Sequence, residues 1–150
     1  SRKLSKYEKE GKLIPVFSMG YGAADGSIVR DPAYPEMPTI TEGYTKLNGK
    51  APSGPAAAAY NAYLHMGVTA SKSFILPKGT PDEIVDVWVE AVKKVVADKG
   101  FRKVAAKVVG AYQQSYGKDA ANVLRMATDV SPETKAWLKA WIKRRFDHDI

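Results

Sequence analysis

Hydrophobic residues recur along the chain in two patterns, one typical of short strands and one typical of amphipathic helices. Short apolar runs bounded by Gly and Pro predict strands at 12–17 and 71–76, and a third short strand is expected at 111–115. Apolar residues spaced three and four apart predict helices over 81–98, 101–108, 119–126 and from Pro132 onward. An alanine-rich segment over 56–66, which ends at Gly67, predicts one more helix.

Cap signals mark where three helices begin. A capping box combines a Thr or Ser cap with a Glu three residues later, and Pro favours the first helical position. These signals are Thr39 with Glu42, Thr80 with Pro81 and Glu83, and Ser131 with Pro132.

Strands that alternate with helices predict an α/β protein in which amphipathic helices pack around short strands. Gly and Pro crowd the first half of the chain, whereas the second half is nearly continuous amphipathic helix. We therefore expect two parts, 1–72 with a long Gly/Pro loop over 18–38, and 73–150 with most of the helices. A loop of that length in a compact domain is usually functional or a linker.

Composition narrows the possible functions. The 150 residues are 45% hydrophobic and carry no cysteine, which suits one buried core and excludes disulfides and cysteine-based metal sites. The net charge of +7 favours anionic partners without choosing among them. Basic clusters such as Lys93–Lys94 and 143–145 stand at the ends of predicted helices, where the helix dipole favours them, so we expect no nucleic-acid partner.

Side chains for catalysis are scarce. His65 is expected to cap the end of the alanine-rich helix, and His148 to lie in a solvated tail. No serine stands in a Gly-x-Ser-x-Gly turn. The sequence therefore predicts a protein that is not an enzyme and that has no metal ion or cofactor.

The loop over 18–38 and the helix start after it are the best candidates for a ligand site. Gly20, Tyr21 and Gly22 are expected to form a backbone cradle, with Thr39 as a donor at a helix N-terminus, and a carboxylate would suit both. A plain glycine turn and a simple helix cap are the alternatives. A dinucleotide fingerprint fails, because Asp25 stands where its next Gly or Ala is required.

Three ordered segments resemble successive signatures of one protein family. They are GKLIPV at 11–16, RDP at 30–32 followed by PEMPTITE at 35–42, and FILPKGTPDEIV at 74–85. The family is that of the tripartite tricarboxylate transporter receptors, or Bug proteins, which are extracytoplasmic solute-binding proteins. The resemblance implies part of a type II periplasmic-binding-protein-like fold, with 1–72 in the second lobe and 73–150 returning to the first. It implies a periplasmic protein that binds a small organic acid by lobe closure and serves membrane transporter subunits indirectly.

The resemblance covers about the C-terminal half of such a receptor. Half a receptor leaves apolar faces and strand edges that something else must cover. The options are another protein chain that carries the other half, self-association, or the missing N-terminal half of a longer protein. The alternative function is a small α/β interaction module that assembles with another chain and performs no catalysis.

Overall fold

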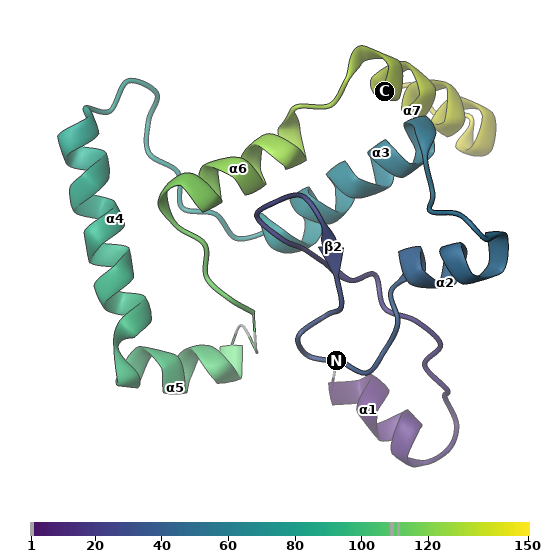
Figure 1. The fold of residues 1–150 in the computed structure, drawn as a ribbon, viewed down its shortest axis with the longest axis horizontal. Helices are drawn as coiled ribbons and strands as arrows, with labels where there is room; N and C mark the ends of the chain where they lie inside the picture. Colours follow the sequence, from purple (N-terminus) through teal and green to yellow (C-terminus); the bar gives the residue numbers. More distant parts are fainter. Residues whose placement is uncertain (1, 109, 111) are drawn as a thin grey trace.

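The computed structural model describes residues 2–108, 110 and 112–150, and Figure 1 shows helices joined by long connections. The α-helices within these ranges are α1 (Arg2–Lys9), α2 (Ile40–Asn48), α3 (Gly54–Leu64), α4 (Asp82–Ala97), α5 (Lys99–Val108), α6 (Gly117–Thr128) and α7 (Pro132–Phe146). A π-helical turn, η1 (His65–Thr69), continues α3, and two short strands, β1 (Tyr21–Gly22) and β2 (Ile28–Val29), form a hairpin.

The expected α/β fold of the periplasmic-binding-protein type is wrong, because the chain is mostly helical. Helices account for 57% of it, and the described residues contain one sheet, in which β1 and β2 pair antiparallel with Tyr21 opposite Val29. The apolar runs at 12–17 and 71–76 are irregular. Ala111 of the third expected strand lies outside the described residues, and 112–115 form no strand.

The physical reason for these errors is that a strand requires a neighbour. Its backbone N–H and C=O groups must be paired with another extended segment, and an apolar run carries no information about where that segment is. Beyond the β1–β2 hairpin, the pairing found in the described part of the chain is a single parallel bridge between Ser18 and Thr39.

Most helix predictions are confirmed, and two boundary details differ. Thr39 and Ser131 cap α2 and α7 as expected. The expected Thr80 cap is wrong, because its hydroxyl donates to the Pro77 carbonyl at 2.7 Å and Pro81 takes the N-cap position of α4. The alanine-rich helix does not end at Gly67, since η1 carries the backbone on to Thr69.

The buried core is small and lies where α3 and η1 meet α6 and α7. Among the described residues its apolar members with little exposure are Leu64, Val123 and Ala127. Leu64 comes from the first half of the chain and the other two from the second, so distant segments share this core.

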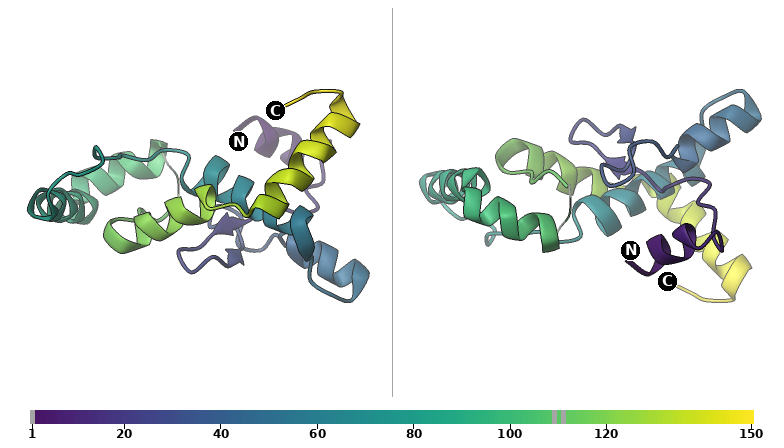
Figure 2. Two further views of the ribbon diagram at one scale, coloured as in Figure 1. Left: turned by 90° about the horizontal axis from the view of Figure 1, so that it is seen from above. Right: turned by 90° about the horizontal axis from the view of Figure 1, so that it is seen from below.

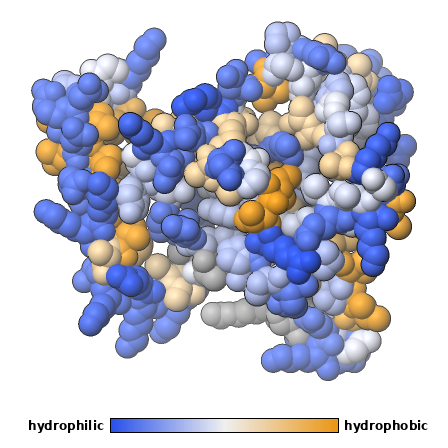
Figure 3. Space-filling view, viewed as in Figure 1, coloured by the Kyte–Doolittle hydropathy of each residue, from blue (hydrophilic) through white to orange (hydrophobic). Residues whose placement is uncertain are grey.

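Outside this core, the molecule exposes much of its surface to solvent. Its accessible surface is 11401 Å², whereas a compact protein of 16.4 kDa exposes about 7,500 Å². Figure 2 places α4 and α5 at one end and α2 and α7 at the other, and Figure 3 shows hydrophobic residues on the surface over α4. In the described residues, no helix combines the length and the hydrophobicity that a membrane crossing needs.

Candidate functional site

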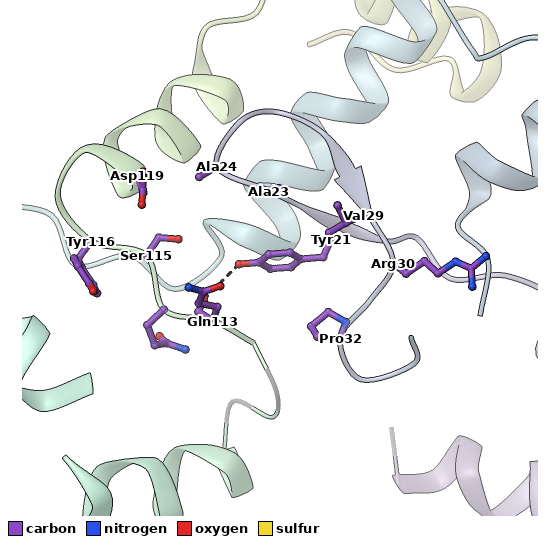
Figure 4. A pocket seen from close by; sticks show the side chains of 11 residues that line it. Tyr21, Ala23, Ala24, Val29, Arg30, Pro32, Gln113, Ser115, Tyr116 and Asp119 are labelled. Carbon is purple, nitrogen blue, oxygen red and sulfur yellow. Dashed lines mark hydrogen bonds between the residues drawn. The ribbon is translucent and has the colours of Figure 1, made fainter. Parts of the chain in front are cut away.

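A cavity of about 440 Å³ lies between the β1–β2 hairpin region and the segment that leads into α6 (Figure 4). The two walls are more than 80 residues apart in sequence. The lining residues are Tyr21, Ala23, Ala24, Val29, Arg30, Pro32, Gln113, Gln114, Ser115, Tyr116 and Asp119. The hairpin side is mainly aliphatic and aromatic surface, whereas the α6 side supplies two amides, two hydroxyls and a carboxylate.

Tyr21, one of the predicted site residues, joins the two walls. Figure 4 shows its side chain reaching from β1 toward Gln113, and its hydroxyl donates to the Gln113 carbonyl at 3.4 Å. The Tyr21 ring lies on that of Tyr112, with 5.6 Å between ring centres. Burial raises the pKa of the Tyr21 phenol, so the hydroxyl keeps its proton at neutral pH.

Tyr112 links the segment before α6 to Asp31, which lies just after β2. Its hydroxyl donates to Asp31 Oδ2 at 3.0 Å. Burial, followed by the hydrogen bond and the negative charge of Asp31, raises the pKa of Tyr112 to about 12. The phenol is therefore a fixed donor to Asp31, and this keeps the segment before α6 next to the hairpin.

Gly20 and Gly22, the other two members of the predicted cradle, flank Tyr21 without lining the cavity. Gly20 has φ of +84°, and a Cβ there would come within 2.7 Å of Ile28 Cγ2. The Gly22 N–H donates to the Thr69 hydroxyl oxygen, and the Thr69 hydroxyl donates to the Gly22 carbonyl, each at 3.2 Å. Gly22 thus lets the hairpin approach η1, whereas Gly20 lies close to Ile28 and Thr39. The Gly22 N–H already has its acceptor.

Thr39, the predicted donor at a helix N-terminus, is not among the lining residues of the cavity and completes a capping box. Its hydroxyl accepts from the Glu42 N–H at 3.0 Å, and its own N–H donates to the Glu42 carboxylate at 2.7 Å. The carboxylate that occupies the start of α2 is therefore the chain's own.

Arg30 connects this helix start to the cavity. Its guanidinium binds the Glu42 carboxylate, with Nη2 to Oε1 at 2.9 Å and Nε to Oε2 at 3.2 Å. The pKa of Glu42 is lowered to about 2, mainly by the hydrogen bond from Arg30 and next by the hydrogen bond from the Thr39 N–H. Figure 4 shows the Arg30 side chain directed away from Tyr21. Arg30 thus lines the cavity with its stem while its charge is engaged by Glu42.

His65 is the buried polar residue nearest the predicted cradle. It is 1% exposed, its Nδ1 lies 2.8 Å from the Asn61 carbonyl, and its Nε2 has no partner in the described part of the chain. The ring packs over Gly22, where a Cβ would come within 2.6 Å of Nε2. His65 occupies the expected C-cap position of α3, with its side chain against the Asn61 carbonyl, although η1 continues the helical backbone beyond it.

The α6 wall is not predicted by the sequence. Segment 111–115 reads as a strand, which gives no reason to expect Gln113, Gln114 or Ser115 in a binding cavity. The α6 N-cap, Tyr116, makes no side-chain cap hydrogen bond, and Tyr116 and Asp119 at this start of α6 both line the cavity. The spacing of apolar residues predicts the helix itself over 119–126, but it does not predict that the segment before the helix lines a cavity.

Ionisable groups do not converge elsewhere in a way that suggests chemistry. Within residues 2–108, 110 and 112–150, no three His, Asp or Glu side chains gather closely enough to hold a metal ion. No protein-family model matches the chain, and searches of curated proteins and of solved structures found no significant similarity. The function must therefore be inferred from the geometry of the cavity and of the surface.

Proposed function

We propose that this protein is a solute-binding component of a secondary uptake system, located in the periplasm, and that it holds a small carboxylate-bearing molecule in the cavity beside Tyr21. It binds and releases the solute without changing it. The observation that carries the proposal is the cavity of about 440 Å³ with hydrogen-bonding groups on one wall and apolar groups on the other. Small-molecule sites commonly have this size and this combination of surfaces.

The uncapped start of α6 supports an anionic ligand. N–H groups in the first turn of a helix, together with the helix dipole, favour a carboxylate even without an Arg or Lys in contact. Ser115 and Tyr116 lie at the same place and supply hydroxyl donors. The three-segment resemblance to the tripartite tricarboxylate transporter receptors supports the same class of ligand.

Asp119 limits how much negative charge the cavity accepts. It belongs to the first turn of α6 and lines the same cavity. Its carboxylate repels a second carboxylate of the ligand but accepts a hydrogen bond from a hydroxyl. We therefore expect a hydroxy acid with one carboxylate to bind more tightly than a tricarboxylate.

A second candidate function is assembly with another protein chain. The observation that favours it is the accessible surface of 11401 Å², which exceeds that of a compact chain of this mass by roughly 3,900 Å². This function is compatible with solute binding, since a partner would cover apolar surface that lies outside the cavity.

Titration calorimetry with lactate, succinate and citrate tests the proposed ligand class. We expect lactate to bind most tightly, and we expect Ala24→Leu, which fills the cavity, to weaken binding at least tenfold. Asp119→Asn should strengthen the binding of succinate and citrate, because it removes the repelling charge.

Ala58→Leu is the matched control, since Ala58 is exposed on α3 away from the cavity. It should bind as the unmodified chain does. Absence of measurable binding of all three acids, or equal weakening by Ala58→Leu and Ala24→Leu, would contradict the proposed function.

A further inference from the structure

Helix α4 carries more apolar surface than a helix that packs on one side requires. With 3.6 residues per turn, its apolar residues spread over about 200° of the helix circumference, whereas a helix packed on one face needs a stripe of roughly 100°. One half of this arc, formed by Val85, Val89, Val92 and Val96, is partly buried. Val89 Cγ1 lies 3.7 Å from the position that a Cβ on Gly117 would take, so this half faces the molecule's own chain.

The other half of the arc faces solvent. Ile84, Trp88 and Val95 are 45%, 44% and 49% exposed, and Ala91 between them is exposed as well. Their spacing of four, three and four residues is that of the seam of a coiled coil. Phe74, itself 71% exposed, lies against Trp88 with 4.9 Å between ring centres and widens the apolar surface.

This seam is complementary to itself when two copies run antiparallel. A twofold axis at the middle of α4 places Ile84 opposite Val95 of the second copy and Trp88 opposite Ala91 of the second copy. Large residues then face small ones, which lets two helices interlock closely.

The charges beside the seam match the same orientation. Glu83 and Lys94 lie on one edge of it, near opposite ends of α4, with Val87, which is 65% exposed, between them. Neither charge forms an ion pair with another residue that the structure describes. In an antiparallel pair, Lys94 of one copy reaches Glu83 of the other on each side of the axis. A parallel pair would set this edge against the valine edge of the other copy and leave both charges unpaired.

We propose that α4 is a dimerisation surface and that its occupant is α4 of a second copy of this chain, antiparallel to the first. A stable interface buries about 800 Å² on each partner, so the dimer must cover Phe74 and neighbouring surface as well as the seam itself. The self-complementary arrangement of large and small residues and of the two charges selects a second copy over an unrelated protein. The proposal does not depend on ligand binding in the cavity.

Sedimentation velocity over a concentration series tests the dimer. We expect the chain to form a dimer at tens of micromolar, and Trp88→Glu to raise the dissociation constant at least tenfold, because it places two carboxylates in the centre of the seam. Leu47→Glu on α2 is the matched control, since Leu47 is 87% exposed and far from α4 in the chain. It should leave the dissociation constant unchanged.

A charge exchange tests the orientation without disturbing the seam. Glu83→Lys or Lys94→Glu alone should weaken the dimer about three- to tenfold, because each creates two contacts between like charges. The double variant E83K/K94E restores both contacts and should dimerise as the parent does. A monomer at every concentration, a dimer that tolerates Trp88→Glu, polydisperse larger particles, or a double variant no better than the single ones would each overturn the proposal.

Discussion

At the scale of single residues, the contact between Gly22 and His65 determines how closely the hairpin approaches η1. The His65 ring is held by its hydrogen bond to the Asn61 carbonyl, and it covers the position where any other residue at 22 would place its Cβ. Thr69 then closes the contact by bonding both backbone groups of Gly22. Tyr21 is consequently turned to the opposite side, toward the cavity.

Gly22→Ala should destabilise the protein by roughly 1–3 kcal/mol, because the new methyl group overlaps a fixed ring. Gly43→Ala is the comparison, since Gly43 lies inside α2 with no atom within 4 Å of the added Cβ. It should stabilise the protein by about 0.5–1 kcal/mol through helix propensity. Urea denaturation followed by circular dichroism measures both, and a Gly22→Ala variant as stable as the parent would show that the ring can move aside.

At the scale of elements, α2 shows how a helix is held at its start by charge. The Glu42 carboxylate accepts hydrogen bonds from both the Thr39 N–H and the Arg30 guanidinium. The cap of α2 and the segment after β2 therefore share one anion. This arrangement stabilises α2 as long as Glu42 is ionised.

The stability of α2 should therefore decrease with acid. Because folding lowers the pKa of Glu42 from its ordinary value of 4.5 to about 2, its stabilising contribution is complete above pH 4.5 and disappears as the pH falls toward 2. NMR or hydrogen exchange of the α2 amides between pH 6 and 2 measures this loss. Glu42→Gln should remove this pH dependence and Glu36→Gln should keep it, since the Glu36 side chain makes no bond to Arg30; equal profiles for both variants would contradict the role of Glu42.

At the scale of the whole molecule, burial is uneven. Among the residues whose burial the structure describes, the buried ones in helices lie in α3, η1, α6 and α7, whereas α4 and α5 contain none. Local stability follows local burial, so the two parts are expected to open independently.

Hydrogen exchange detected by mass spectrometry should resolve these two parts. In dilute solution we expect slow exchange in α3, η1 and α6 and fast exchange throughout α4 and α5. At concentrations at which the proposed dimer would form, α4 should gain protection and α5 should change little. Uniform exchange along the chain at low concentration would contradict the uneven distribution of stability.

The helices and the cavity beside Tyr21 differ in how far they can be predicted. Helix starts at Thr39 and Ser131 follow from contacts within four residues, and the structure confirms them. The glycines around Tyr21 indicate it as a site residue, and it does line the cavity. The opposite wall at Gln113–Ser115 is not predictable in this way, because only the folded chain brings it beside residues more than 80 positions earlier.

Helices are the part of this protein that its sequence determined by itself, since their hydrogen bonds and caps are local. Tertiary structure alone decided that the apolar runs at 12–17 and 71–76 remain irregular, that His65 is buried over Gly22, and that one face of α4 stays exposed. Each of these outcomes depends on which distant segment arrives as a neighbour. Backbone pairing and burial are properties of that encounter, whereas the periodicity of a helix belongs to the segment itself.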